Sequence, residues 1–510
     1  MRVLGIALAL VLGFAPVGST ATTATSAEVS GGPRVKVDGG EVEGVRTGRV
    51  ERYNGIPFAA PPLGPRRWRA PQPAPAWSGV RSGRDARPNC LQDPHDGVPG
   101  PQSEDCLYLN VTTPARKSRE PLPVMVWLYG GGFFQGAGND YDPARLVADG
   151  NVIVVTPNYR LGTFGFLAMP DLPDAGSFGL LDQRAALRWV QRNAKSFGGD
   201  PGKVTLFGES AGGMSTCALL TSPQTKGLFH RAIMQSGTCD TEWPAYLPKG
   251  LGPFQRVDEL RRQGLAFAKE LGCTTIACLR AKPADLLQTG MKTFGPAYGT
   301  SLLPLEPSEA LRRGTFHRVP TLVGTTRDES RLSIAFAVPR PLTPQGYRDL
   351  LAEDYGPDAA RVVKRYPPVQ GDNGMNYADL STDRTWAFTT RRTQDALAGR
   401  TPLYAYEFAD RNAPAFKGMP NPGYPYGAFH GSELNYLFEI LGEKPAFTPA
   451  QRDLAAAMVQ VWTTFAATGR PGWPAYGATG RVQSFAPGNI GPTNYVRNHQ
   501  LDFWSDLHGR

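Results

Sequence analysis

Residues 204–212 of the chain read VTLFGESAG. The first four residues are apolar or β-branched and predict a short buried strand. Gly208, Ser210 and Gly212 then form a G-x-S-x-G pattern, and a helix is expected from Gly213. At a sharp strand-to-helix turn, the flanking glycines remove β-carbons that would collide, so the serine hydroxyl stands clear. The pattern predicts a nucleophile at Ser210; its alternative, a glycine-flanked serine in an ordinary turn, is disfavoured by the strand and helix around it.

Further short apolar runs lie on both sides of this stretch and alternate with helical segments. The run 152–155 does not alternate, as expected for a strand buried on both faces of a mainly parallel sheet. A helix is predicted over 180–197, where apolar residues recur every four positions, and another over 449–467, where Thr448-Pro449 stands at the start and Gly469 follows the end. We therefore predict an α/β fold with a large, mostly parallel central sheet flanked by helices. The predicted strands are Val124–Tyr129, Asn151–Pro157, Lys203–Phe207, Arg231–Gln235, Val319–Val323 and Leu403–Phe408.

The rest of the chain adds to this sheet without marking a second unit. Residues 35–60 alternate apolar and polar side chains between glycine turns and predict a small antiparallel portion at the N-terminal end. Residues 240–315 and 327–400 are expected to be helical or irregular insertions. Because no linker is visible, we expect residues 28–510 to form a single domain.

The N-terminal segment 1–27 resembles a secretory signal. Arg2 provides a positive start, Val3–Ala15 is uncharged and mostly apolar, and small residues follow, with cleavage expected after Ala21 or Ala27. No later stretch of about 18 apolar residues occurs, so no membrane insertion is expected. The sequence therefore predicts a secreted protein.

The six cysteines fall into neighbouring pairs, and an oxidising compartment would favour disulfides between them. Six cysteines allow 15 connectivities, so their order alone proves none of them. Neither a C-x-x-C motif nor a Cys/His ligand spacing occurs, and we expect no zinc site. The neighbouring pairs are Cys90 with Cys106, Cys217 with Cys239, and Cys273 with Cys278.

The composition is that of a folded globular protein. Hydrophobic residues make up 41%, aromatic residues 10% and charged residues 19% of the chain, which argues against intrinsic disorder. The formal net charge is +9, but the arginines are scattered, and Arg66, Arg67 and Arg69 form the densest patch. A basic stripe is therefore absent, and no nucleic-acid partner is predicted.

A glycine-rich loop follows the predicted strand that ends at Tyr129. Its sequence, Gly130-Gly131-Gly132-Phe133, would let backbone N–H groups approach a ligand closely. Together with the N–H of Ala211, such groups can stabilise an oxyanion. The glycine-containing segment that follows this loop does not fit a dinucleotide-binding fingerprint, since Tyr141 stands at the position of the third glycine.

A serine nucleophile needs a base, and histidine is the usual one. His430 lies in a glycine-flanked loop after the strand Leu403–Phe408 and follows the serine, as this architecture requires. The other histidines are less suitable: His95 precedes the serine, His230 and His317 lead into strands, and His499 and His508 lie in a polar tail.

The third member of a triad would be a carboxylate after the strand Val319–Val323. Asp328 and Glu329 both stand there, and the residues alone do not choose between them. Without the serine and the histidine, the same pair would be interpreted as a solvated charge cluster.

Taken together, these motifs resemble the type-B carboxylesterase and cholinesterase family of α/β-hydrolases, over most of the chain. The resemblance implies an α/β-hydrolase fold and ester hydrolysis without a metal or an organic cofactor. The stretches that carry it are Tyr53–Ala59, Ser103–Asn110, Gly130–Phe133, Asn158–Gly162, Phe197–Pro201, Gly208–Gly212 and Gln235–Gly237.

The resemblance also implies roles for single residues. It selects Glu329 rather than Asp328 as the acid that orients His430. It maps the family's disulfides onto Cys90–Cys106 and Cys273–Cys278, while the pair Cys217–Cys239 rests on proximity in the sequence. The implied site comprises Ser210, His430 and Glu329 as the triad, Gly131, Gly132 and Ala211 as oxyanion donors, and Glu209 and Ser236 as supporting residues.

One departure bears on the substrate. Cholinesterases carry a tryptophan between the first two cysteines that stacks on a quaternary ammonium, but residues 91–105 contain no aromatic side chain here. We therefore expect a secreted serine carboxylesterase that acts on small-molecule esters and is not specific for choline esters. The alternatives are another serine hydrolase, such as a lipase, thioesterase or amidase, and a non-catalytic binding protein of the same fold.

Overall fold

The computed structural model describes residues 31–93, 100–242, 253–338, 340–419 and 421–508. The predicted signal segment 1–27 and His95 lie outside these described residues. Within the described part of the chain, no helix combines the length and the apolar character needed to cross a bilayer.

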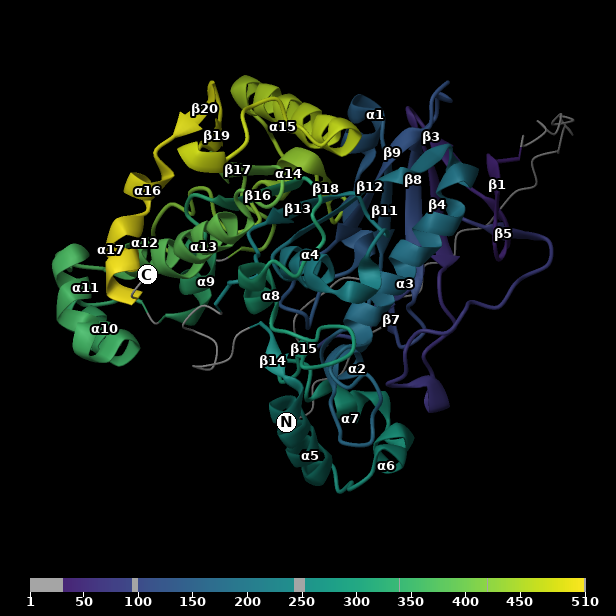
Figure 1. The fold of residues 1–510 in the computed structure, drawn as a ribbon, viewed down its shortest axis with the longest axis horizontal. Coiled ribbons are helices and arrows are strands. Elements are labelled where there is room, and N and C mark those ends of the chain that lie inside the picture. Colours follow the sequence, from purple (N-terminus) through teal and green to yellow (C-terminus); the bar gives the residue numbers. More distant parts are fainter. Residues whose placement is uncertain (1–30, 94–99, 243–252, 339, 420, 509–510) are drawn as a thin grey trace, which may run out of the picture.

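One large sheet of eleven strands runs through the molecule (Figure 1). Its strands are β3 (Val45–Thr47), β4 (Val50–Pro57), β8 (Tyr108–Pro114), β9 (Leu122–Leu128), β11 (Ile153–Pro157), β12 (Gly199–Glu209), β13 (Arg231–Gln235), β16 (Thr321–Thr326), β17 (Leu403–Phe408), β19 (Val482–Ala486) and β20 (Asn489–Thr493). Their order is β20-β19-β17-β16-β13-β12-β9-β11-β8-β4-β3.

The middle of this sheet is parallel and its two edges are antiparallel. Neighbours from β19 through β17, β16, β13, β12 and β9 to β11 are parallel. Strands β20, β8, β4 and β3 pair antiparallel with their neighbours. The predicted mostly parallel sheet is therefore confirmed, and the carboxyl ends of its central strands meet along one edge, where open α/β sheets usually bind ligands.

Helices cover both faces of the sheet. They are α1 (Ala144–Gly150), α2 (Gly162–Phe166), α3 (Phe178–Asn193), α4 (Ala211–Thr221), α5 (Val257–Glu270), α6 (Ile276–Ala281), α7 (Ala284–Gln288), α8 (Pro307–Arg313), α9 (Ser330–Ala337), α10 (Pro344–Tyr355), α11 (Ala359–Arg365), α12 (Gly374–Ser381), α13 (Phe388–Leu397), α14 (Leu434–Leu437), α15 (Pro449–Thr468), α16 (Tyr495–Asn498) and α17 (Leu501–His508). A π-helix, Thr382–Ala387, joins α12 to α13.

Strand β9 shows why the sheet needs cover on both sides. Met125 and Trp127 belong to the core that also contains α15 residues such as Trp462. Val124 and Val126, which alternate with them, belong to the core on the opposite face, together with α3 residues. Because all these side chains are apolar, the strand lacks an exposed face, which explains its continuous hydrophobic run.

Most predicted elements are confirmed, with shifts at their ends. Helix α3 stops at Asn193, and a 3₁₀ turn continues over Ala194–Phe197. Strand β16 begins at Thr321, later than predicted, because Pro320 has no N–H to donate to a neighbouring strand. Helix α15 begins with a capping box at Thr448 and ends before a left-handed Gly469, as the sequence indicated.

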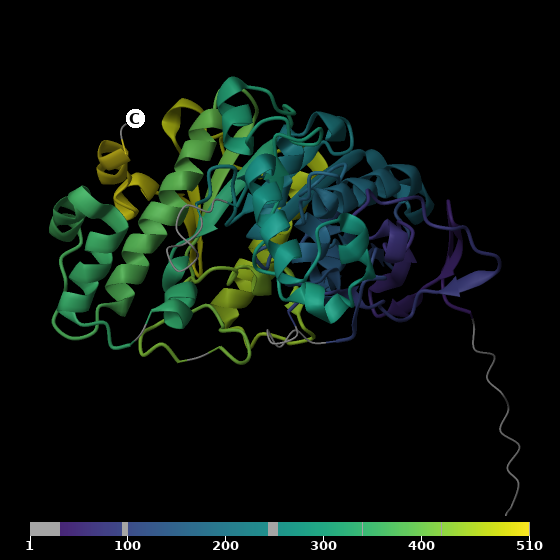
Figure 2. The same cartoon turned by 90° about the horizontal axis from the view of Figure 1, so that it is seen from below.

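The N-terminal portion is antiparallel, as predicted. Strands β1 (Arg34–Val37) and β2 (Gly40–Glu43) form an antiparallel pair, as do β3 and β4. Strand β5 (Val80–Ser82), outside the predicted stretch, joins β2 in parallel. The remaining short strands pair as β6 (Asn89–Cys90) with β7 (Gln102–Ser103), β10 (Tyr141–Asp142) with β18 (Glu439–Ile440), and β14 (Gln255–Arg256) with β15 (Ala297–Tyr298). Figures 1 and 2 place the purple N-terminal strands and the yellow C-terminal helices at opposite ends of the molecule.

The two insertions form separate helical groups. Helices α5, α6 and α7 project from the bottom of the molecule in Figure 1, whereas α10 and α11 lie at its left end beside α17. The segment that returns from the second group, the π-helix, lies close to the region after β16, where Ser330 donates its backbone N–H to the hydroxyl of Thr382.

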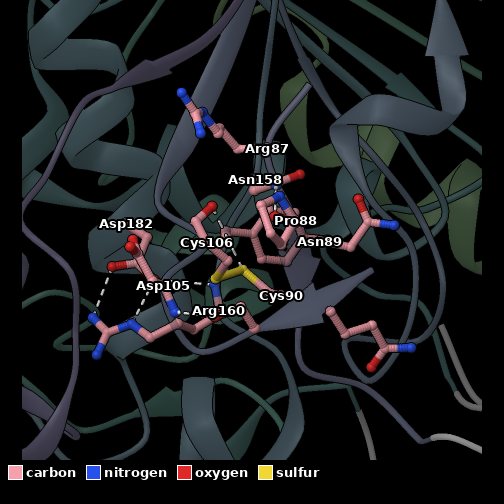
Figure 3. The surroundings of a disulfide bond; sticks show 12 residues. Arg87, Pro88, Asn89, Cys90, Asp105, Cys106, Asn158, Arg160 and Asp182 are labelled. Atoms are coloured by element: carbon pink, nitrogen blue, oxygen red, sulfur yellow. Dashed lines mark hydrogen bonds and ion pairs between the residues drawn. A yellow bond between two sulfur atoms is a disulfide. The ribbon is translucent and has the colours of Figure 1, made fainter. Parts of the chain in front are cut away.

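All three neighbouring cysteine pairs are joined as disulfides: Cys90–Cys106, Cys217–Cys239 and Cys273–Cys278. Figure 3 shows the first of them beside the buried ion pair of Arg160 and Asp182, whose Nη2 and Oδ1 atoms are 2.7 Å apart. The disulfide joins two segments of the N-terminal region next to this ion pair.

Candidate active site

Ser210 lies at the turn between β12 and α4. Its backbone has φ 55° and ψ −124°, a strained conformation for a residue other than glycine. A β-carbon on Gly212 would lie 1.9 Å from the carbonyl oxygen of Leu128, and one on Gly208 would lie 2.5 Å from that of Gly212. Only glycine fits at these two positions, which is the steric need that the sequence pattern indicated.

The glycine loop after β9 lies directly against this turn. A β-carbon on Gly130 would approach the Cβ of Ser210 to 3.0 Å. Gly131 and Gly132 have φ values of 104° and 61°, which L-residues rarely adopt. Among the described residues, the N–H groups of Gly131, Gly132 and Ala211 donate no hydrogen bond. Three backbone donors therefore surround the serine without a partner, as an oxyanion site requires.

The structure brings His430 to Glu329. The imidazole Nδ1 lies 2.6 Å from Oε2 of Glu329, and Oε1 of that carboxylate accepts the N–H of Thr326 at 2.8 Å. Glu329 is fully buried, whereas the His430 side chain is 21% exposed. Because Nδ1 donates to a carboxylate, Nε2 is the atom left to exchange a proton with a substrate or a nucleophile.

Asp328 has a different position from its neighbour. Its carboxylate accepts the N–H of Ala428 at 2.9 Å and pairs with Arg411 at 2.8 Å and Arg331 at 3.1 Å. A β-carbon on Gly427 would lie 2.3 Å from its Oδ2. Asp328 therefore holds the loop that carries His430. Both carboxylates are buried, so the alternative of a solvated charge cluster is wrong.

Glu209 faces the other nitrogen of His430. Its Oε1 lies 3.1 Å from Nε2, so the imidazole is flanked by two carboxylates. Burial raises the pKa of Glu209 to about 7. Burial would lower the pKa of His430, but the carboxylates of Glu209 and Glu329 outweigh it and raise that pKa to about 9. The pair lies within ion-pair distance, but Oε1 of Glu209 accepts no hydrogen bond from any described residue.

Ser236 lies next to the elbow but contributes through its backbone. Its N–H donates to the carbonyl of Gly324 at 2.8 Å, and its φ is 46°. The buried Ser236 hydroxyl makes no hydrogen bond to any described residue. The structure thus places Ser236 near the triad without a hydroxyl contact to it.

Two residues next to the site were not predicted from the sequence. Glu433 is fully buried, its Oε1 accepts from Gln235 Nε2 at 3.1 Å, and burial raises its pKa to about 8. The ring of Trp386 lies 4.5 Å from the imidazole of His430, centre to centre. Glu433 follows His430 by three residues and could have been weighed, whereas Trp386 lies in an insertion and nothing in the sequence singled it out.

A cavity of about 1090 Å³ opens onto these groups. Ser210, His430 and Trp386 line its inner part. Phe336 and Leu441 line it as well, and they are 68% and 53% exposed, so the outer wall of the cavity is partly apolar and open to solvent. The cavity has room for an ester much larger than an acetyl ester.

The remaining described histidines lie elsewhere. His230 and His317 hydrogen-bond backbone atoms and have the structural roles that were expected of them. The assignment of His499 to a polar tail is wrong, because this residue is 2% exposed and lies between two carboxylates. Helices α16 and α17 fold back onto the sheet, which the local sequence does not indicate.

Comparison with known proteins agrees with this geometry. The chain matches the model of the Carboxylesterase family over residues 31–504. It is 37% identical over 467 residues to the para-nitrobenzyl esterase of Bacillus subtilis (strain 168), covering 86% of this chain and 91% of that protein. It is 36% identical over 487 residues to the fumonisin B1 esterase of Sphingopyxis macrogoltabida, covering 88% and 85%. A solved PNB esterase structure superposes with a TM-score of 0.75 at 33% identity, over 92% of this chain and 99% of that one.

Proposed function

Because this chain belongs to the carboxylesterase family, whose members hydrolyse carboxylic esters, we propose that it is a secreted serine carboxylesterase that uses Ser210, His430 and Glu329. The observation that carries the proposal is the 2.6 Å contact between Glu329 and Nδ1 of His430, made at a cavity that Ser210 also lines. It fixes the imidazole in the tautomer that a general base needs.

In the first half of the reaction, Ser210 Oγ attacks the ester carbonyl while His430 Nε2 takes its proton. The negative charge that develops on the carbonyl oxygen is stabilised by the N–H groups of Gly131, Gly132 and Ala211. His430 then gives the proton to the leaving alcohol, and an acyl-enzyme remains.

In the second half, a water molecule replaces the alcohol and the same groups act again. His430 takes a proton from the water, and the tetrahedral species collapses to release the acid and the free serine. Glu209, 3.1 Å from Nε2, stabilises the imidazolium that forms in each half. Its negative charge also raises the pKa of His430, and so sets the pH above which His430 acts as a base.

The proposal includes export and the extent of the domain. We assign residues 1–27 to a cleaved signal and residues 28–510 to one catalytic domain. The three disulfides support this assignment, since such bonds persist in oxidising compartments. The test is the mass of the protein recovered from the medium of the producing cells; a mature chain that retains Met1 contradicts the proposal.

For the substrate, we propose uncharged or weakly charged esters larger than acetyl esters. The cavity volume and its exposed apolar wall at Phe336 and Leu441 support this class. A chromogenic series with acyl chains of increasing length, together with a choline ester and an emulsified triglyceride, measures the preference. A choline ester turned over best would contradict it.

The decisive experiment is Ser210→Ala, with Ser215→Ala as the matched control. Ser215 is a buried serine on α4 that bonds Gln183 and does not line the cavity. Loss of the nucleophile is expected to lower kcat by a factor on the order of 10⁴–10⁶, while the control keeps wild-type activity and both variants keep the unfolding midpoint. Near-wild-type hydrolysis by Ser210→Ala would remove the basis of the proposed mechanism.

A further inference from the structure

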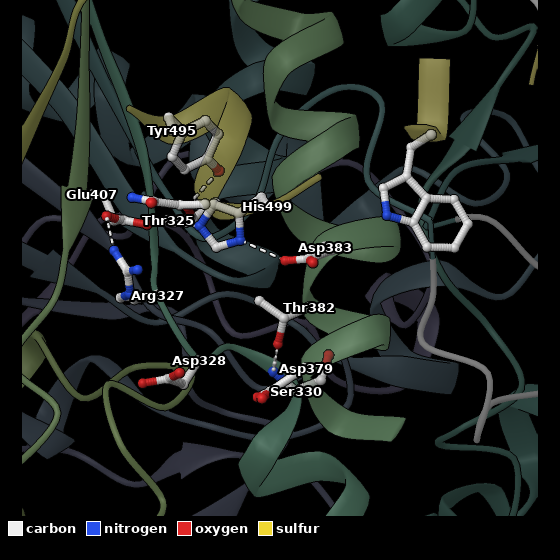
Figure 4. A network of polar contacts seen from close by, with 12 residues as sticks. Thr325, Arg327, Asp328, Ser330, Asp379, Thr382, Asp383, Glu407, Tyr495 and His499 are labelled. Atoms are coloured by element: carbon white, nitrogen blue, oxygen red, sulfur yellow. Dashed lines mark hydrogen bonds and ion pairs between the residues drawn. The ribbon is translucent and has the colours of Figure 1, made fainter. Parts of the chain in front are cut away.

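A second buried histidine, His499, lies between two carboxylates at the junction of α16 and α17 (Figure 4). Its Nδ1 is 2.7 Å from Oδ1 of Asp383, and its Nε2 is 2.6 Å from Oε1 of Glu407. The side chains of His499 and Glu407 are 2% and 0% exposed, so water does not separate these groups. The proposed mechanism makes no use of this cluster.

A charged His499 satisfies both contacts without a proton on either carboxylate. A neutral imidazole has one N–H donor and one acceptor nitrogen, but both ring nitrogens here face carboxylate oxygens, which only accept. A doubly protonated ring satisfies both contacts. The second oxygen of Glu407 pairs with Arg327 at 3.2 Å, so two cations balance the two carboxylates. The cluster is therefore neutral as a whole when His499 is protonated.

One of these carboxylates belongs to the π-helix beside the catalytic residues. Asp383 is its second residue and also accepts the hydroxyl of Tyr366 at 2.9 Å. The preceding residue, Thr382, accepts the N–H of Ser330, which directly follows Glu329, at 3.0 Å. Trp386 in the same π-helix packs on the ring of His430. Movement of Asp383 would therefore displace Trp386, which contacts His430, and Thr382, which contacts the residue after Glu329.

The other carboxylate leads to the same place from the sheet. Glu407 lies on β17 and binds Arg327, which stands two residues before Glu329 at the end of β16. The backbone N–H of Arg327 donates to the carbonyl of Phe408 at 2.9 Å. Two routes, each made of contacts and short stretches of chain, thus connect His499 to the catalytic pair. One leads through Asp383 to His430, and the other leads through Glu407 to Glu329.

We propose that His499 is a positioning residue for ester hydrolysis: its charge joins the C-terminal segment to the π-helix and to β17, and so holds Trp386 against His430 and keeps Glu329 in register. This inference rests on the proposed function of His430 and Glu329. The distances between the histidine and the two carboxylates carry it, together with the continuity of the π-helix between Asp383 and Trp386. The C-terminal segment, the π-helix and β17 thus meet at this one imidazole.

The charges around His499 set the pH at which it loses its proton and its contacts with the two carboxylates weaken. Burial would lower its pKa, but the hydrogen bonds and charges of Asp383 and Glu407 raise it to about 9. The other titratable groups that face the cluster are Arg327, just after β16, and Tyr495 from α16, whose ring centre is 4.6 Å away. Tyr366 donates its hydroxyl to Asp383, and burial raises its pKa far above the usual range. Asp379 on α12 acts on Asp383 through its charge. Burial raises the pKa of Tyr495 far above its usual range, so it adds no charge.

The test is His499→Gln in the full chain, with His317→Gln as the matched control. His317 is a partly buried histidine that bonds the backbone of Ser222, away from the cavity. With p-nitrophenyl butyrate between pH 6 and 10, His499→Gln is expected to lower kcat about tenfold and to change KM less than about twofold. His317→Gln is expected to stay within about twofold of wild type in both constants.

A double-mutant cycle shows whether the effect passes through Trp386. In a Trp386→Leu background, His499→Gln is expected to change kcat less than about twofold, because the ring that it positions is gone. A full tenfold effect in that background overturns the proposed route. An unchanged kcat and pH profile for His499→Gln, with only a lower unfolding midpoint in urea, overturns the positioning role altogether.

If His499→Gln does not fold, Asp383→Asn provides the second variant. It preserves the shape but removes one charge and replaces one acceptor oxygen with an NH2 donor. It is expected to lower kcat several-fold with KM unchanged; wild-type kcat overturns the inference. Failure of the proposed function is distinguishable, because it appears as activity retained by Ser210→Ala. Failure of the present inference appears as unchanged kcat in a protein whose activity Ser210→Ala abolishes.

Discussion

Two histidines of this protein each lie between two carboxylates. His430 lies between Glu329 and Glu209, at 2.6 and 3.1 Å, and His499 lies between Asp383 and Glu407, at 2.7 and 2.6 Å. Carboxylates raise the pKa of each to about 9. They differ in access, since the side chain of His430 is 21% exposed and lines the cavity, whereas that of His499 is 2% exposed and does not line it.

This difference teaches that a histidine between carboxylates is not in itself a catalytic device. What distinguishes His430 is that one of its two partners can yield Nε2 to a nucleophile at the surface of a cavity. At His499 both contacts are sealed, so the proton stays and the charge serves to fix the chain. Similar electrostatics can therefore support catalysis at one site and cohesion at another.

The difference between the two histidines is tested most strongly by replacing one carboxylate at each of them. Glu329→Gln is expected to lower kcat by about 10²–10⁴-fold, because the imidazole loses its orientation and the support for its positive charge. Glu407→Gln, the matched change at His499, is expected to lower kcat less than about tenfold. Steady-state kinetics with a chromogenic ester measure both, and equal losses would mean that access does not separate the two sites.

Asp328→Ala serves as the control for the choice of acid. It is expected to lower kcat much less than Glu329→Ala, since Asp328 binds the loop of His430 and not its ring. The reverse order would show that the wrong carboxylate was assigned.

A smaller effect is expected from Glu209→Gln, and it sharpens the role of the second carboxylate at His430. The base form of His430 exists above its pKa, so kcat/KM rises with pH until about pH 9. Without the charge of Glu209, the pKa of His430 falls and this rise moves to lower pH. The pH profile of kcat/KM measures the shift. Glu443→Gln, at the exposed rim of the cavity, is the control and leaves the profile in place.

The smallest expected effect concerns stability and belongs to His499. The carboxylates around His499 raise its pKa in the folded state from the ordinary value of 6.5 to about 9, so the folded protein binds this proton more tightly than the unfolded chain does. The stabilisation is fully present below about pH 6.5 and is lost as the pH rises through about 9. Urea midpoints of wild type and His499→Gln between pH 6 and 10 are expected to converge at the alkaline end. A constant difference would show that His499 is not charged in the folded state.

Much of the fold could be predicted because it is encoded by neighbouring residues. Continuous apolar runs marked the parallel strands, and Gly469 and the Thr448 cap marked the ends of α15. The resemblance to type-B carboxylesterases is confirmed by the family match over residues 31–504. The insertions could only be described as helical, since weak periodicity does not fix how helices pack.

The features of the site likewise differ in whether neighbouring residues in the sequence indicate them. The elbow at Ser210 and the glycine loop could be identified from the sequence because they depend on steric limits between adjacent residues. The carboxylate that meets His430 could not be chosen from the residues alone, since Asp328 and Glu329 are neighbours and point to different partners.

By itself, the sequence determined the strand-turn-helix at Ser210, the parallel sheet and the class of chemistry, because backbone sterics and side-chain periodicity act over a few residues. Only the tertiary structure decided that Trp386 packs on His430 and that His499 reaches Asp383 and Glu407, which are 116 and 92 residues away along the chain. The order of the strands and the return of the last helices bring these groups together, and no local pattern records that order.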